Sequence, residues 1–146
     1  MRNKARQALA SATLLSLIVS WNVGAQAQQP LQYSVLFSDS NRITHFRHEH
    51  LSWEERPGGG MSTPFLDASK IGFLRIPKGS KSDLHPAPAK QFVMVLTGVM
   101  EVQSGDGERR QFLPGSVLLV TDTQGPGHWT NALGKEDVFL VWVPIP

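Results

Sequence analysis

The sequence predicts an all-β domain, and three observations support this prediction. Behind residue 27, Gly, Pro, Asp and Ser interrupt the chain roughly every 8–12 residues, a spacing typical of turns in an antiparallel sheet. The stretches between these interruptions are short and rich in β-branched and aromatic residues. None of them shows the apolar period of an amphipathic helix. Many short antiparallel strands with glycine corners favour a closed barrel or a double-sheet jelly roll.

The first half of this domain contains three expected strands. Apolar and β-branched residues predict strands over 31–37 and 43–53, the second being the more polar. A Pro- and Gly-rich run at 56–60 predicts a loop. The third strand is expected over 70–76, and the Pro-Lys-Gly sequence that follows ends it.

The second half shows a clearer pattern of strands and turns. The strand expected over 91–97 is apolar on both faces, and Gly98 separates it from the next. The Gly-Asp-Gly sequence at 105–107 predicts a tight hairpin, because Gly tolerates positive φ. The remaining strands are expected over 99–103, 109–113, 117–120, 128–130 and 137–143.

The N-terminal 27 residues have the three parts of an export signal. A positive start without acidic residues precedes a mostly apolar stretch, 8–21, and small residues end at Ala25-Gln26-Ala27. A retained transmembrane anchor is the alternative, but the apolar stretch is shorter than the ~20 residues that span a bilayer. We therefore expect a periplasmic or secreted protein with no stable membrane anchor after signal cleavage.

Composition narrows the possible partners and chemistry. The whole chain has 14 basic and 12 acidic residues, but Arg2, Lys4 and Arg6 belong to the signal, which leaves 11 against 12. A net charge of about −1 argues against a nucleic-acid partner. The absence of Cys excludes disulfides, thiol chemistry and Cys-based zinc sites. We expect N-terminal strands and a loop over 28–69 that pack on a barrel core over 70–146.

Two histidines are singled out by their surroundings. His85 is followed directly by Pro-Ala-Pro, and Gln91 lies six positions after it. His128 comes directly after the sequence Asp-Thr-Gln-Gly-Pro-Gly, which begins at Asp122. Each His follows a Gly- or Pro-rich turn and enters a strand. A barrel directs side chains at such positions toward its mouth, so both are candidate site residues.

These residues resemble the cupin superfamily over roughly residues 70–143. The first cupin motif, G-x5-H-x-H-x3-4-E-x6-G, keeps Gly79, His85 and Gly98, but Ala87 replaces its second His and Gln91 its Glu. The second motif, G-x5-P-x-G-x2-H-x3-N, is matched at its central Gly by Gly125 and at its His by His128. Its Pro is replaced by Thr123, its first spacer is two residues longer and its Asn comes one position early, at Asn131. The resemblance implies a cupin-type double-stranded β-helix, that is, a jelly-roll barrel, and makes a homodimer the expected assembly, with residues 31–55 as a plausible contact.

The resemblance also implies a metal site, which is altered in this chain. Cupins of the standard pattern hold a divalent metal with three imidazoles and one carboxylate. Here His85, His128 and the neutral amide of Gln91 are the expected ligands of one Fe, Mn, Ni, Cu or Zn ion. The alternative is that the two imidazoles are hydrogen-bonded and line a pocket for an organic ligand without a metal.

Other side chains are candidates for contacts with a substrate. Asp122 could add a carboxylate to the site or cap its own turn. Arg75, in an otherwise apolar strand, could bind a substrate carboxylate inside the barrel or pair at the surface. Trp129 and Trp142 are candidate walls of a pocket or of the core. The alternation of His48 and His50 places them on one strand face, which is more typical of a solvated strand than of a metal site without a third ligand.

Two functions follow from these expectations. One is a metal-dependent enzyme of dioxygenase, isomerase, decarboxylase or lyase type that acts on a small organic molecule, with the metal as Lewis acid. The other is a non-catalytic barrel that binds a small ligand. The replacements at Ala87 and Gln91 are compatible with both, and fold alone does not decide between them.

Overall fold

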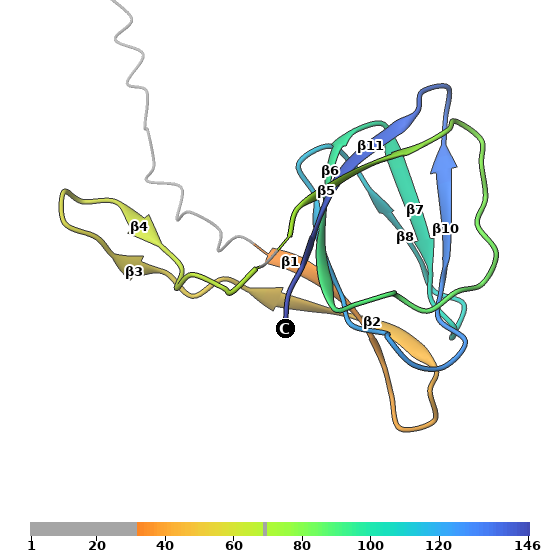
Figure 1. Cartoon of the computed structure of the whole chain (residues 1–146), viewed down its shortest axis with the longest axis horizontal. Coiled ribbons are helices and arrows are strands. Elements are labelled where there is room, and N and C mark those ends of the chain that lie inside the picture. The colour runs from red at the N-terminus through yellow and green to blue at the C-terminus, as the bar shows by residue number, and fades with distance from the viewer. Residues whose placement is uncertain (1–31, 69) are drawn as a thin grey trace, which may run out of the picture.

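The computed structural model describes residues 32–68 and 70–146, and in this part of the chain the ordered elements are β-strands and turns (Figure 1). The predicted export signal at 1–27 lies outside the described residues. Among the residues that are described, no helix is long and apolar enough to cross a membrane. The prediction of an all-β fold is confirmed.

Most strands lie close to where the sequence predicts them. The described residues form β1 (Gln32–Ser38), β2 (Thr44–His50), β3 (Glu54–Glu55), β4 (Met61–Ser62), β5 (Gly72–Ile76), β6 (Gln91–Thr97), β7 (Val99–Gln103), β8 (Arg109–Phe112), β9 (Val117–Val120), β10 (Trp129–Leu133) and β11 (Val138–Pro144). The expected strand over 43–53 is wrong in its last part, because β2 ends at His50. The predicted loop at 56–60 is the tip of the short β3–β4 hairpin, closed by a hydrogen bond from the Arg56 N–H to the Gly60 carbonyl, 2.7 Å.

The strands form two facing sheets and a separate hairpin. The larger sheet has the order β2-β1-β9-β6-β11-β5, and the smaller has the order β10-β7-β8. The segment before β6 continues the smaller sheet, because Lys81 pairs with Asn131 and His85 with His128 beside β10. Strand β1 is part of the larger sheet, where it runs parallel to β9 and antiparallel to β2.

The order of pairing defines a jelly roll. Counting the segment around 81–85 as a strand, eight strands from β5 to β11 pair as nested antiparallel partners. The first pairs with the last (β5 with β11), the second with the seventh (81–85 with β10), the third with the sixth (β6 with β9) and the fourth with the fifth (β7 with β8). One long hairpin wound around a barrel produces this nesting. The predicted jelly-roll barrel is confirmed.

The core lies between the two sheets. Leu36 and Leu118 are essentially inaccessible to solvent, and burial of such a side chain contributes about 1.5–3 kcal/mol. Phe46 and Phe112 pack with ring centroids 6.2 Å apart, and so join β2 to the smaller sheet. Because the N-terminal strands contribute Leu36 and Phe46 to this cluster, they form part of the barrel interior.

Candidate functional site

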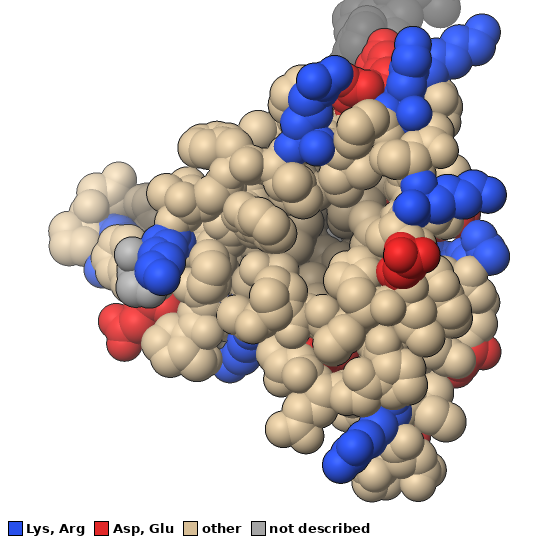
Figure 2. All heavy atoms as spheres, turned by 45° about the vertical axis from the view of Figure 1, so that its right-hand side comes forward, with Lys and Arg blue, Asp and Glu red and all other residues tan. Residues whose placement is uncertain are grey.

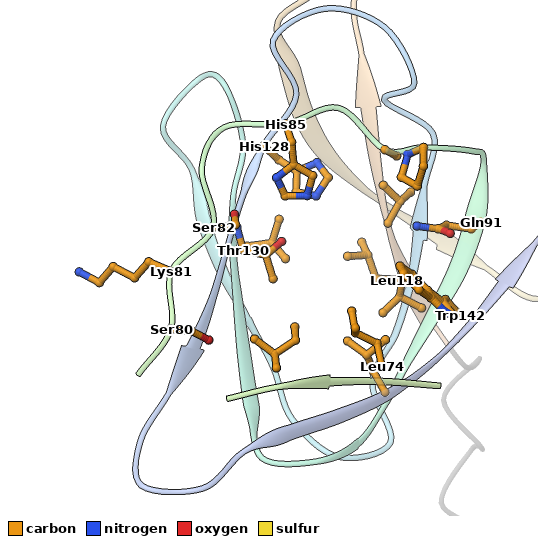
Figure 3. A pocket seen from close by; sticks show the side chains of 17 residues that line it. Leu74, Ser80, Lys81, Ser82, His85, Gln91, Leu118, His128, Thr130 and Trp142 are labelled. Atoms are coloured by element: carbon orange, nitrogen blue, oxygen red, sulfur yellow. The ribbon is translucent and has the colours of Figure 1, made fainter. Parts of the chain in front are cut away.

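The interior of the barrel contains a cavity of about 290 Å³ that is apolar on most sides (Figure 3). Ten aliphatic, proline or aromatic residues line it: Leu74, Ile76, Ala87, Pro88, Val93, Val102, Leu118, Val120, Leu140 and Trp142. Its polar lining consists of Ser80, Lys81, Ser82, His85, Gln91, His128 and Thr130. In the space-filling view the molecule is hollowed near its centre, and most Lys, Arg, Asp and Glu side chains lie around the margin of this face (Figure 2).

The two predicted histidines lie side by side in this cavity. Their backbones pair across the smaller sheet, because each N–H donates to the other's carbonyl, at 3.0 and 2.9 Å. Gly127 makes this pairing possible: a Cβ at that position would overlap the His85 carbonyl oxygen, and its φ is +91°. The imidazole centroids are 4.7 Å apart with an interplanar angle of 51°.

Each imidazole has one nitrogen engaged by the protein. The Nδ1 of His85 lies 2.8 Å from the Asp83 carbonyl oxygen, and the Nδ1 of His128 lies 2.6 Å from Asp122 Oδ2. Since a carbonyl and a carboxylate accept, both Nδ1 atoms carry the proton and donate it. The Nε2 atom of each neutral ring is therefore left with a lone pair for a ligand.

Asp122 lies behind His128 rather than in the cavity. Its side chain is fully buried, and its Oδ1 has no hydrogen-bond partner within the described residues. A buried carboxylate with one partner is costly unless positive charge lies nearby. Through the imidazole, Asp122 therefore favours a cation at His128 Nε2, and it holds the ring in place. The sequence placed Asp122 among the substrate contacts, whereas the structure gives it this supporting position.

Gln91 and Ala87 occupy the two altered motif positions. Gln91 begins β6, its residue is only 6% exposed, and Figure 3 shows its amide directed into the cavity from a different wall than the histidines. Ala87 is buried and donates its N–H to the Asp122 carbonyl oxygen, 3.1 Å. Its methyl group adds apolar surface where the cupin pattern has an imidazole.

The donor set fits a divalent ion that is only partly held by the protein. His85, His128 and Gln91 all line the cavity; two imidazoles suit Zn, Ni, Cu, Fe or Mn, and the Gln91 amide offers a third donor. Among the described residues, no group of three or more His, Cys, Asp or Glu side chains is arranged to hold a metal. An ion there would keep positions for water or a substrate, a property of catalytic rather than structural sites.

Of the other predicted site residues, Arg75 and Trp129 lie outside the cavity lining, whereas Trp142 lies within it. Arg75 is exposed and pairs with Asp137, its Nε and Nη2 both 2.6 Å from Oδ2. Trp129 lies next to His128, and strand alternation directs it to the opposite side of β10. His48 and His50 lie on β2, where Arg110 Nη1 is 3.2 Å from His48 Nε2. Trp142 lines the cavity wall.

Four polar cavity residues escaped the sequence analysis, namely Ser80, Lys81, Ser82 and Thr130. Thr130 and Ser82 lie beside each other on the polar side of the cavity, joined by hydrogen bonds from Ser82 N to Thr130 O, 2.8 Å, and from Thr130 N to Ser82 Oγ, 2.7 Å. Thr130 follows His128 by two residues, so the two-residue strand period would have placed both on one face. No comparable signal marked Ser82.

The N-terminal strands hold the loop that carries Asp122 and His128. The buried Thr44 hydroxyl donates to the Gly127 carbonyl, 2.8 Å, and accepts from the Gly105 N–H. The Thr121 N–H donates to the Leu36 carbonyl, 2.8 Å. Strands β1 and β2 thus position one half of the site.

Comparisons with known proteins identify similar folds only. No family model matches the chain, and no curated protein matches it. Solved structures with a similar fold include a conserved protein of unknown function from Streptococcus pyogenes, with 25% sequence identity and a TM-score of 0.41. The match covers 52% of this chain and 63% of that protein. A putative ethanolamine utilization protein Q from Salmonella typhimurium matches with 14% identity and a TM-score of 0.41, over 80% of this chain and 97% of that one. The Cnp3 cupin domain of Schizosaccharomyces pombe matches with 15% identity and a TM-score of 0.43, over 84% of this chain and 88% of that one.

Proposed function

We propose that the protein binds a small, largely apolar organic molecule in the barrel cavity and acts on it with a divalent metal ion held at His85 and His128. The observation that carries this proposal is the engagement of both Nδ1 atoms, which directs two Nε2 lone pairs into the cavity. Imidazoles that bind metals in proteins usually donate their other nitrogen to a carboxylate or carbonyl in this manner.

The walls of the cavity define the class of molecule that fits. Its volume of about 290 Å³ is near the lower end of the ~300–1,000 Å³ typical of ligand pockets, which favours a small molecule. Aliphatic side chains and Trp142 would contact the apolar part of the molecule. The hydroxyl groups of Ser82 and Thr130 and the two imidazoles lie where its oxygen atoms would bind.

The chain's own residues have distinct roles in this proposal. His85 and His128, with Gln91, would hold the ion, which when bound supplies a Lewis acid for an oxygen of the substrate. Asp122 holds the His128 ring through Nδ1. The apolar walls limit access of water to the bound molecule. This arrangement supports an enzyme of oxygenase, isomerase or lyase type.

A second candidate is a binding protein that uses no metal. It is favoured by the absence of a third His, Asp or Glu ligand among the described residues and by Ala87 at an altered motif position. The imidazoles would then accept hydrogen bonds from the ligand at Nε2. This candidate shares the cavity with the first and differs in its need for an ion.

Metal titration separates the two candidates. Calorimetry of the purified protein with Zn²⁺, Ni²⁺, Cu²⁺ and Mn²⁺ should show one ion per chain, weakened at least about 100-fold by His85→Ala and by His128→Ala. His50→Ala removes an exposed imidazole on β2 and is the matched control. Absence of stoichiometric binding, or binding that survives both cavity substitutions, would overturn the metal-dependent proposal.

Two further measurements refine the test. Gln91→Glu adds a carboxylate and should tighten metal binding; unchanged or weaker binding would exclude Gln91 as a ligand. Catechol, a small ring with two adjacent oxygens, is a suitable probe of the cavity. Catechol binding that requires the ion supports the enzyme, whereas equal binding without the ion supports the metal-free candidate.

We also propose that the protein acts outside the cytoplasm, in the periplasm or the medium. Support comes from the cationic, apolar and small-residue parts of residues 1–27. The mature protein recovered from the periplasm should begin at Gln28. Recovery of an uncleaved chain from the cytoplasm would contradict export.

A further inference from the structure

A second cleft, of about 340 Å³, lies where β1 and β2 of the larger sheet meet β8 of the smaller one. Ser34 of β1, His48 of β2, Arg110 of β8 and Ser116, just before β9, contribute polar groups to its lining. This cleft, here called the β8 cleft, has no lining residue in common with the interior cavity. It is therefore a separate hollow of the molecule.

Arg110 occupies an inward-facing position on β8. It pairs with Val102 in the register of β7 and β8, and both Val102 and the alternating residue Phe112 are buried in the core. Its neighbour Arg109 points to the opposite side of the strand. The exposed fractions agree with this arrangement, because the Arg110 side chain is 20% exposed and that of Arg109 is 54% exposed. A guanidinium remains charged when it is partly buried, so its N–H groups require acceptors.

The contacts of Arg110 use only part of its donor capacity. Nε lies 2.6 Å from Glu108 Oε1, and Nη1 lies 3.2 Å from His48 Nε2 and 3.5 Å from Ser34 Oγ. Of the five N–H groups of a guanidinium, two belong to Nη2, which makes no hydrogen bond within the described residues. Glu108 is the only carboxylate that pairs with Arg110 in this part of the chain, and it does so through Nε. The edge formed by Nη1 and Nη2 therefore has no anionic partner there.

Two contacts hold the guanidinium in a fixed orientation. Its Cζ atom lies 4.7 Å from the centroid of the Phe46 ring, and Glu108 binds Nε. Stacking on an aromatic face leaves the N–H groups in the plane of the guanidinium available for hydrogen bonds. The Glu108 side chain is 44% exposed, so solvent screens its charge, and none of the described residues that line the β8 cleft is Asp or Glu. An anion would thus meet a preorganised cation in a lining without negative charge.

We propose that the β8 cleft binds the oxyanion group of a small molecule, a carboxylate or a phosphate, at Nη1 and Nη2 of Arg110. The planar fork of a guanidinium matches two oxygens of either group. The hydroxyl groups of Ser34 and Ser116 in the lining offer further donors to the anion. This site is independent of the metal and the organic molecule proposed for the interior cavity.

NMR titration of the purified protein tests this site with two probes, inorganic phosphate and succinate. At least one probe should bind and shift the amide signals of Ser34, His48 and Arg110, and a preference between the probes assigns the phosphate or the carboxylate class. Arg110→Gln removes the charge and should weaken binding at least about 10-fold. Arg109→Gln is the matched control, because it removes the same charge from the opposite face of β8 and should leave binding unchanged.

Two further variants keep the test decisive. Arg110→Lys retains the positive charge but loses the fork, so it should also weaken binding, and it replaces Arg110→Gln if that variant fails to fold by circular dichroism. His128→Ala alters the interior cavity and should leave probe binding intact. The proposal is overturned if neither probe binds, if a folded Arg110 variant binds as tightly as the wild type, or if His128→Ala abolishes binding.

Discussion

Two regions of this barrel use histidine beside aspartate, and they differ in how many ring nitrogens remain free. In the inner pair, His85 and His128, each ring donates one Nδ1–H and leaves Nε2 in the cavity. In the His45 clamp on β2, both nitrogens face carboxylates: Nδ1 lies 2.7 Å from Asp106 and Nε2 3.2 Å from Asp39. The inner pair can bind a ligand, whereas the clamp joins the β1–β2 turn to the β7–β8 hairpin.

The difference teaches that the surroundings, more than the residue type, set the role of an imidazole. The His45 side chain is about one-third exposed, so its ion pairs are screened by solvent. His128 and Asp122 are buried, so loss of the contact between them would leave the buried Asp122 carboxylate without its hydrogen-bond donor, which is costly. Changes at the inner pair should therefore have larger effects than changes at the clamp.

The largest effect is expected for Gly127→Ala. Its Cβ would overlap the His85 carbonyl and separate the two backbone segments that form the inner pair. We expect a loss of about 3 kcal/mol or more in the free energy of unfolding, measured by urea denaturation. Gly79→Ala is the control, because Gly79 also has positive φ, +71°, but open space around it. Equal losses in both variants would contradict the overlap.

The next effect concerns the carboxylate behind His128. Asp122→Asn keeps the shape of the side chain and removes its charge, so metal affinity should fall about 10–100-fold, measured by calorimetry. Asp106→Asn makes the same change in the His45 clamp and should leave metal affinity unchanged. Affinity that is insensitive to Asp122→Asn would mean that the buried carboxylate does not support the site.

A smaller effect is expected at Thr44, which lies between the two regions. Thr44→Val preserves the shape but leaves the Gly127 carbonyl and the Gly105 N–H without this hydroxyl. The free energy of unfolding should fall by about 1–3 kcal/mol, and Thr44→Ser should restore most of it. If Thr44→Val unfolds at the wild-type denaturant concentration, the hydroxyl does not hold the loop.

The smallest effect is the pH dependence of the His45 clamp. Hydrogen bonding to Asp106 raises the pKa of His45 above 6.5, and contacts with Asp39 act in the same direction. The contribution of protonated His45 to stability is therefore fully present below pH 6.5. It is lost as pH rises through the raised pKa of His45. The pKa values of Asp39 and Asp106 are lowered from 3.8. The contribution of these two carboxylates to stability is therefore present above pH 3.8 and is lost at lower pH, as they become protonated.

Thermal unfolding of wild type and His45→Gln across the neutral range measures this contribution. The difference in Tm should shrink as the solution becomes alkaline. A difference that is constant with pH would show that the charge of His45 plays no part.

The sequence predicted the fold well because strand periodicity and turn chemistry are local. Glycines at 98 and 107 were expected to separate strands, and both have positive φ in the structure. The end of the strand over 43–53 was missed. The chain beyond His50 leads instead into the short β3–β4 hairpin, in which Glu54 pairs with Ser62 and Glu55 with Met61.

The resemblance to the cupin motifs implied that His85, Gln91 and His128 share one site, and all three line the cavity. The amino-acid order determined the alternation that makes every strand, the apolar faces on both sides of β6 and the two imidazoles at strand entries. Only the tertiary structure decided that Asp122 lies behind His128 and that Thr44, 83 positions from Gly127, holds the site loop. These contacts depend on how strands distant in the chain pack, and periodicity along one strand contains no information about which side chain another strand brings to it.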